Sequence, residues 1–235
     1  MQVSCTKKNF YDVVKQMGIE LSEKQLQQYE IYAKMLVEWN EKMNLTAITD
    51  IDQIYERHFL DSILPAFETT LQGSICDVGA GAGFPSIPLK ILLPELKVTI
   101  VETLGKRITF LKALCEALDI EVELVNARSE EYALQKRESF DYVTARAVAN
   151  LSMLAELCIP LVKVDGIFLA LKGSAALEEL EKGQKAITIL GCKLENTYIH
   201  DFKDHGKHIN LHFRKIKACD KKYPRAFAKI KKNPL

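Results

Sequence analysis

The stretch SICDVGAGAGFP, residues 74–85, decides the fold of this chain. The strand-like run 75–78, apolar except for Asp77, leads directly into Gly79, Gly81 and Gly83, and a helix is expected to follow. Glycines permit positive φ and let a ligand approach the backbone closely. The spacing is G-x-G-x-G, whereas dinucleotide-binding folds use G-x-G-x-x-G on a pyrophosphate. The pattern favours a cationic or zwitterionic ligand, whose positive part Asp77 would attract. A purely structural glycine turn is the alternative.

After residue 74 the sequence alternates between strand-like and helix-like segments. Longer helical stretches, such as 106–118 and 151–162, separate most of the strand-like segments. This alternation predicts a mostly parallel sheet with helices on both faces. Residues 193–199 and 209–216 alternate as strands with a short connection, so an antiparallel pair is expected at one edge. The short apolar runs that predict parallel strands are 75–78, 98–101, 122–125, 142–145 and 167–171.

The first seventy residues predict helices. Ser22 and Gln25 have the spacing of a capping box, and a second helical segment opens at Asp50 and is expected to end at Pro65. We therefore expect an N-terminal helical extension over 1–70, packed on an α/β domain over 71–220, with a basic tail over 221–235. Residues 39–46 show no clear periodicity and are expected to separate the two helices.

Composition excludes several classes of protein. The chain has 235 residues, of which 48% are hydrophobic and 27% charged, enough apolar residues for a core. Its longest apolar runs are too short to span a membrane, and its first residues lack the apolar region of a secretory signal. The six cysteines include no C-x-x-C pair, so we expect reduced, buried thiols in a cytoplasmic protein.

The balanced net charge of +1 hides an asymmetry. Residues 203–235 contain eleven basic and two acidic residues, whereas the preceding chain has 21 basic against 29 acidic residues. Such a split indicates a polyanionic partner on one part of the surface. A solvated tail that only keeps the protein soluble is the alternative.

Polar residues follow each predicted strand at its carboxyl end, where open α/β sheets bind ligands. Glu102 lies nineteen residues after Gly83, where nucleoside-binding folds place a carboxylate on the ribose hydroxyls. Ser129 and Glu130 could frame a base, although Glu130 could also be a simple helix N-terminal acid. Arg146 ends an apolar strand and needs an anion, which is a ligand carboxylate, a nucleic-acid phosphate or another side chain.

Several segments together make the chain similar to one family of class I methyltransferases. The sequence resembles the small-subunit ribosomal RNA guanine-N7 methyltransferases, also called glucose-inhibited division protein B, from about residue 25 to the tail. The segment RHFLDS at 57–62, placed before the glycine turn, makes the resemblance specific. The other matching segments are NLT at 44–46, DVGAGAGFP at 77–85, KRITFL at 106–111, TARAVA at 144–149, YPR at 223–225 and NPL at 233–235.

The resemblance implies a Rossmann-like, mostly parallel seven-stranded sheet with an antiparallel edge strand, and S-adenosylmethionine as cofactor. It implies cofactor contacts by Gly79, Phe84, Glu102, Ser129, Glu130 and Arg146, to which Asp77 and Gly81 of the glycine turn are added. Two departures are visible. Ser129-Glu130 stands where the family commonly has Ala-Glu, and Ala226-Phe227-Ala228 stands where it often has Gly-Thr-Pro. The second departure bears on RNA contacts by the tail.

The implied reaction is methylation of N7 of a guanine in 16S ribosomal RNA. Guanine N7 has an in-plane lone pair and no proton, so direct in-line transfer needs positioning and no general base. No Asn-Pro-Pro-Tyr or Asp-Pro-Pro-Tyr motif follows the fourth strand, and no Pro-Cys pair marks a cysteine nucleophile. Arg146 is assigned a positioning role on the cofactor carboxylate or an RNA phosphate. A nicotinamide-dependent oxidoreductase and a catalytically silent RNA-binding protein are the competing hypotheses.

The expected partner is 16S ribosomal RNA, either free or within the small subunit, and the expected state is a monomer. Arg57, His58 and Asp61 could line the RNA approach, or Arg57 and Asp61 could form an internal ion pair beside His58. His200, His205, His208 and His212 lack metal-ligand spacing and are expected to be surface histidines, without a metal. The basic residues expected on rRNA phosphates are Arg214, Lys215, Lys217, Lys221, Lys222, Arg225, Lys229, Lys231 and Lys232.

Overall fold

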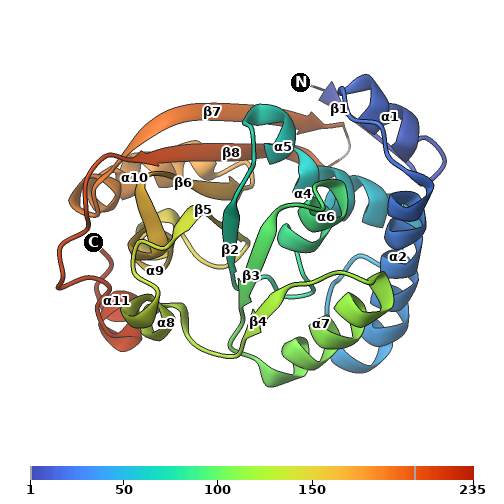
Figure 1. Ribbon diagram of the computed structural model, residues 1–235. Coiled ribbons are helices and arrows are strands. Elements are labelled where there is room, and N and C mark those ends of the chain that lie inside the picture. The colour runs from blue at the N-terminus through green and yellow to red at the C-terminus, as the bar shows by residue number, and fades with distance from the viewer. Residues whose placement is uncertain (1, 204) are drawn as a thin grey trace.

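The computed structural model describes residues 2–203 and 205–235, and within them eight strands form one mixed sheet (Figure 1). The strand order is β1-β7-β8-β6-β5-β2-β3-β4. All five predicted parallel strands are present. The strands are β1 (Gln2–Val3), β2 (Ser74–Val78), β3 (Lys97–Val101), β4 (Glu123–Val125), β5 (Phe140–Arg146), β6 (Val162–Lys172), β7 (Cys192–Phe202) and β8 (Gly206–Lys215).

The antiparallel pair predicted at the edge is confirmed as the β7–β8 hairpin. Within it β8 runs antiparallel to both of its neighbours, β6 and β7. The sequence did not predict β1, whose two residues pair in parallel with the outer side of β7. The chain first builds β2, β3 and β4 outward and then places β5 on the other side of β2. The carboxyl ends of β2 and β5 therefore flank the point where the strand order reverses, where open sheets bind ligands.

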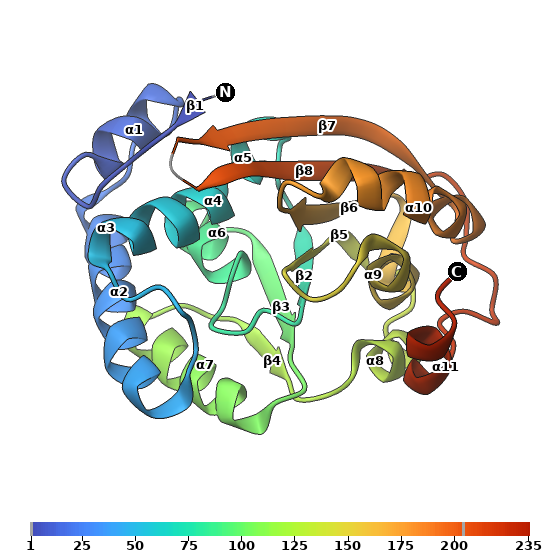
Figure 2. The ribbon, with the colours of Figure 1, turned by 180° about the vertical axis from the view of Figure 1, so that it is seen from behind.

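Helices cover both faces of the sheet. Successive residues of a strand point to opposite faces, so Ile75 of β2 and Leu169 of β6 pack in one hydrophobic cluster, while Cys76 and Phe168 pack in the other. Figures 1 and 2 show the helices of the two clusters on opposite sides of the sheet. The first cluster contains α1 (Phe10–Gln16), α2 (Glu23–Met43), α6 (Ser86–Leu92) and α7 (Gly105–Leu118), and the second contains α8 (Ser129–Gln135), α9 (Leu151–Cys158), the 3₁₀ turn η2 (Ile159–Leu161), α10 (Ala176–Ile189) and α11 (Phe227–Lys232).

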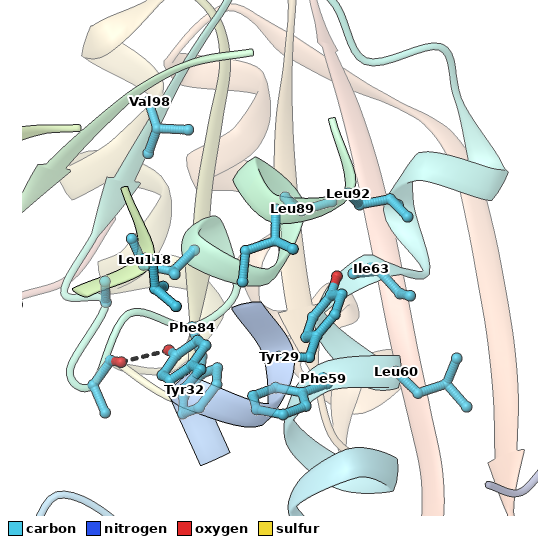
Figure 3. Packing of buried hydrophobic residues seen from close by; sticks show 14 of the residues in the cluster. Tyr29, Tyr32, Phe59, Leu60, Ile63, Phe84, Leu89, Leu92, Val98 and Leu118 are labelled. Carbon is cyan, nitrogen blue, oxygen red and sulfur yellow. Dashed lines mark hydrogen bonds between the residues drawn. The ribbon is translucent and has the colours of Figure 1, made fainter. Parts of the chain in front are cut away.

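The N-terminal helices share the first cluster with the sheet. Ser22 and Gln25 form the predicted capping box, in which the Ser22 hydroxyl accepts from the Gln25 N–H and the Gln25 side chain accepts from the Ser22 N–H. Helix α2 runs on to Met43, so part of the segment expected to separate the helices is helical. Tyr29 and Tyr32 of α2 are fully buried, and Tyr32 lies stacked on Phe84 at 5.3 Å between ring centroids (Figure 3).

The predicted second helical segment begins at its N-cap Asp50 and ends at Ile63, just before Pro65, but the sequence did not predict its π-helical middle or the short helix that follows. The segment consists of α3 (Ile51–Gln53), a π-helix η1 (Ile54–Leu60), α4 (Asp61–Ile63) and α5 (Pro65–Glu68). Pro65 is the first residue of α5, a position where its missing N–H costs nothing. A π-helix is rare and is frequently found at functional sites. Here it carries Arg57 and His58.

All six cysteines are free and buried, as the sequence predicted. No helix of the described part of the chain is long and apolar enough to cross a membrane.

The tail is fastened to the domain by a buried ion pair. The Arg225 guanidinium donates to both carboxylate oxygens of Glu156 in α9, at 2.6–3.1 Å, and the Arg225 backbone N–H donates to the same carboxylate at 2.8 Å. The Glu156 side chain is fully buried and that of Arg225 is 14% exposed. Loss of one partner from such a pair leaves an uncompensated charge in the interior.

We expect Arg225→Ala to lower the free energy of unfolding by about 3–5 kcal/mol, measured by urea denaturation. The matched control is Arg214→Ala, because Arg214 also makes a two-pronged pair, with Glu195, but both side chains are about one-third exposed. That change should cost about 1 kcal/mol or less. Equal losses for the two variants would contradict the buried-pair interpretation.

Candidate active site

The glycine turn begins at the carboxyl end of β2, and the side chain of Val148 packs directly against its backbone. Gly79 has φ +73, and its N–H donates to the Val101 carbonyl at 2.8 Å. A Cβ on Gly79 would lie 2.9 Å from Cγ2 of Val148, so a larger residue would push Val148 out of place. The turn is supported from below by Tyr32, whose hydroxyl donates to the Ala82 carbonyl at 2.6 Å.

Glu102 lies at the end of β3, as predicted, and joins the turn to the start of α7. Its side chain is 2% exposed and accepts from the backbone N–H groups of Gly81 at 3.1 Å and Leu104 at 3.0 Å. The Arg107 guanidinium donates to the same carboxylate at 3.3 Å. A carboxylate held by these three donors is fixed in place at the end of the strand.

A cavity of about 270 Å³ lies over the ends of β2, β3 and β4, and we call it the glycine-turn cavity. Four of the predicted cofactor residues line it, namely Gly79, Glu102, Ser129 and Glu130. Apolar side chains form much of the remaining wall. The sequence analysis did not identify the lining residues Thr103, Arg107, Val148, Leu157 and Phe227. Arg107 and Val148 had a signal, because they lie in the matching segments KRITFL and TARAVA.

Asp77 lies beneath the glycine turn and does not line this cavity. Its carboxylate accepts from the Ser86 N–H at 3.1 Å, while its Oδ1 has no partner among the described residues. Burial raises the pKa of Asp77 to about 7, against the opposing effect of Ser86. The attraction of a positive ligand by Asp77 stays a prediction, and it would require the ionised form of this buried carboxyl group.

Arg146, at the end of β5, lines a second cavity of about 510 Å³, which we call the Arg146 cavity. Its guanidinium donates to Asp61 at 2.8 Å and to the Arg57 carbonyl at 3.2 Å, and it lies 4.8 Å from the ring centroid of Phe84. His58 stacks on the same ring at 4.4 Å. Phe84 is thus a buried platform for Arg146 and His58, and it does not line the glycine-turn cavity.

Asp61 was expected to pair with Arg57, and that alternative was wrong. Its carboxylate is shared by Arg146 and His208, with His208 Nδ1 at 2.6 Å. Arg57 instead donates to Gln53 at 3.2 Å. Burial alone would raise the pKa of Asp61, but the hydrogen bond from His208 and the charge of Arg146 outweigh it and hold this pKa below its usual value.

His58 is a neutral hydrogen-bonding group rather than a charged one. Burial, together with the nearby charge of Arg146, lowers the pKa of His58 to about 3. Its Nε2 lies 2.8 Å from the Thr46 hydroxyl, and its Nδ1 lies 3.3 Å from Arg146. At neutral pH this ring therefore adds no charge to the Arg146 cavity.

The expectation of surface histidines was wrong for His200 and His212. Both are buried and direct Nε2 at Glu68 of α5, which also accepts from Asn210 at 2.7 Å. His208 is the half-buried partner of Asp61. Within the residues described, no three His, Cys, Asp or Glu side chains are arranged to hold a metal ion.

The basic residues expected on RNA differ widely in exposure. Lys215 is fully buried, because its ammonium donates to the carbonyls of Ile159 and Val162 and pairs with Glu138, so its predicted phosphate contact was wrong. Arg225 and Arg214 are engaged by the carboxylates described above. The exposed members of the set are Lys217, Lys221, Lys222, Lys229, Lys231 and Lys232.

The fold is that of the class I methyltransferases. Two solved structures with the same architecture are precorrin-6y C5,15-methyltransferase from Geobacter metallireducens, with a TM-score of 0.51, 18% identity and 66% of this chain and 87% of that chain covered, and TYW2 from M. jannaschii in complex with AdoMet, with a TM-score of 0.53, 16% identity and 68% and 76% covered. At these identities the likeness concerns the fold alone.

Sequence similarity is much closer to one family within this class. The profile of the family described as rRNA small subunit methyltransferase G matches residues 25–210. Two proteins with that name, from Bacillus subtilis and Bacillus velezensis, are 54% and 51% identical to this chain, with 93% and 96% of it and 94% and 97% of the relatives covered. The chain belongs to the rRNA small subunit methyltransferase G family, which confirms the resemblance found in the sequence.

The opposite surroundings of Asp77 and Asp61 predict opposite pH dependences of stability. Between pH 4 and 7 folded Asp77 keeps a proton that the unfolded chain loses, so its contribution to stability falls as pH rises. Asp77→Asn should remove this effect. The free energy of unfolding of the variant should therefore rise relative to that of the parent by up to about 4 kcal/mol between pH 4 and pH 8.

Asp61→Asn serves as the control for that series. Because the pKa of Asp61 is lowered in the fold, its contribution is present at neutral pH and is lost as pH falls through the folded pKa. The free energy of unfolding of Asp61→Asn should therefore fall furthest below that of the parent at neutral pH. Urea denaturation at each pH measures both differences, and a pH-independent difference for Asp77→Asn would contradict the assignment.

Proposed function

We propose that this protein transfers a methyl group from S-adenosylmethionine to N7 of a guanine in 16S ribosomal RNA. Membership of the rRNA small subunit methyltransferase G family, over residues 25–210, carries this proposal. The two neighbouring cavities at the carboxyl ends of β2 and β5 support it, because the reaction brings a nucleoside cofactor and an acceptor base together.

The glycine-turn cavity has the chemistry that an adenosine group requires. Gly79 lines this cavity with a backbone that carries no Cβ, and the Glu102 carboxylate, which also lines it, is fixed where ribose hydroxyls can donate to it. Ser129 and Glu130 begin α8 and offer backbone N–H groups to a base. Apolar residues such as Leu157 exclude water from the remainder. When bound, S-adenosylmethionine supplies an electrophilic methyl group on a sulfonium.

The Arg146 cavity is the proposed acceptor site. Ala147 lines both cavities, so the two are adjacent along the end of β5. Arg146 is held by Asp61 and the Arg57 carbonyl, with its side chain 15% exposed, and it positions an anion at this cavity. A bidentate contact to guanine O6 and N7 would block the reacting lone pair, so we assign Arg146 to the cofactor carboxylate or an RNA phosphate.

No proton has to be removed from guanine N7, and the residues around Arg146 are consistent with that. The low pKa of His58 makes it a poor proton carrier at neutral pH, and Asp61 is occupied by Arg146 and His208. In-line positioning can supply most of the acceleration. The chain's task is then to orient the acceptor base and keep water out.

For RNA binding we propose the exposed tail lysines, Lys222 in particular, together with Arg57 at the rim of the Arg146 cavity. Lysine–phosphate contacts release counterions, so the affinity should fall steeply with salt. Arg214 and Arg225 were also predicted to contact RNA, and for them this stays a prediction beside the ion pairs they make within the chain.

The direct test is to map N7-methylguanine in 16S ribosomal RNA from cells with and without this gene. The modification should be lost at one guanine in the deletion strain, because the proposal assigns this methylation to this protein. It should return when the gene is restored. Chemical cleavage at N7-methylguanine followed by primer extension locates the site. Identical maps from the two strains would refute the proposed function.

Arg146→Lys tests the positioning role, since lysine keeps the charge but loses the planar fork. We expect kcat/KM for methylation to fall about 100-fold, as misplacement by about 1 Å does in other enzymes. A raised Kd for S-adenosylhomocysteine would place Arg146 on the cofactor carboxylate, and a raised KM for RNA alone would place it on a phosphate. Lys182→Arg, exposed on α10 and outside both cavities, is the control, and normal binding and turnover by Arg146→Lys would refute the role.

A further inference from the structure

The C-terminal tail forms part of the wall of the glycine-turn cavity. Phe227, the first residue of α11, is half-buried and lines this cavity with Glu102, Ser129 and Leu157. Figures 1 and 2 both show α11 next to α8, the helix that begins at Ser129. Residues about one hundred positions apart in the sequence thus meet at one end of the cavity.

The Phe227 ring is held against the loop that offers its backbone to the base. The guanidinium carbon of Arg128 lies 4.5 Å from the centroid of the Phe227 ring, within the range of a cation–π contact. Arg128 is the N-cap residue of α8 and immediately precedes Ser129 and Glu130. The ring therefore stands at the base end of the cavity, while Glu102 stands at the ribose end.

This position of Phe227 is fixed by contacts that need no ligand. On one side Arg225 is bound by the buried Glu156, and on the other Ile230 is fully buried against α9 and its neighbours. The preceding segment is held by Arg137, which donates to the carbonyls of Cys219, Asp220 and Tyr223 at 2.6–2.9 Å. A side chain fixed before binding loses little entropy when a ligand arrives.

We propose that Phe227 is a cofactor-affinity and specificity residue whose ring packs on the adenine of S-adenosylmethionine. An aromatic ring suits a purine because both present apolar π-faces, and such stacking stabilises bases in single-stranded nucleic-acid sites. The tail then has two separate tasks, since Phe227 faces the cavity while Lys229, Lys231 and Lys232 are exposed. This inference rests on the proposed function.

The test compares ligand affinity in Phe227→Ala, Phe227→Leu and the parent by isothermal titration calorimetry. The probes are S-adenosylhomocysteine and 5′-methylthioadenosine, which share the adenosine group but differ in the amino-acid part. Phe227→Ala should raise the Kd of both by about tenfold, because both lose the same stacking contact. Phe227→Leu should raise both by about threefold, because it retains apolar area. Lys231→Ala, on the same helix but exposed, should leave both unchanged.

Melting temperatures measured without ligand show whether the substitution displaces α11. If Phe227→Ala lowers the melting temperature, the Kd values of Phe227→Leu decide whether the ring contributes to nucleoside affinity. Unchanged Kd values in both Phe227 variants would overturn the inference. Weakened binding of 16S ribosomal RNA without ligand, at unchanged nucleoside affinity, would also overturn it and assign the ring to RNA. A parent protein that binds neither probe would instead refute the cofactor assignment, which separates that failure from this one.

Discussion

The buried carboxylate of Asp61 is the constraint on which the site depends. It is 4% exposed and lies in α4, yet its partners are Arg146 of β5 and His208 of β8. An unpaired charge at that depth would cost several kcal/mol, so the N-terminal helices can dock on the sheet only where both partners reach Asp61. This requirement fixes the π-helix η1 over the end of β5. It also fixes Arg57 and His58 at the rim of the Arg146 cavity.

The same contact explains why the two cavities are distinct but adjacent. Arg146 is drawn toward Asp61 and the Phe84 ring, on the side of the N-terminal helices. The next residue, Ala147, turns away with φ +56, a conformation that costs energy for a residue with a Cβ and persists only where neighbours enforce it. Val148 then closes against Gly79. The end of one strand thus contributes Arg146 to the Arg146 cavity, Val148 to the glycine-turn cavity and Ala147 to both.

The sequence predicted those features whose determinants lie close together in the chain. The strands, the capping box at Ser22 and the turn at Gly79 each follow from a few neighbouring residues, and the structure confirms them. The Asp61–Arg146 and Asp61–His208 pairs join residues 85 and 147 positions apart, and no local pattern specifies such a choice of partner. For the same reason, the sequence placed Lys215 among the exposed basic residues, although its position in β8 buries its ammonium group among carbonyl groups.

The tail shows how a change of local sequence acquires meaning only in three dimensions. In the sequence, Ala226-Phe227-Ala228 is a departure from a family pattern that concerns RNA. In the structure, the fork between Arg225 and Glu156 sets the direction of the chain, and that direction brings the next aromatic side chain to the glycine-turn cavity. A buried ion pair contributes little net stability by itself, but it specifies one arrangement among many. Here the specified arrangement makes the C-terminal tail part of the wall of the glycine-turn cavity, so a substitution in the tail can act on that cavity as well as on the basic surface.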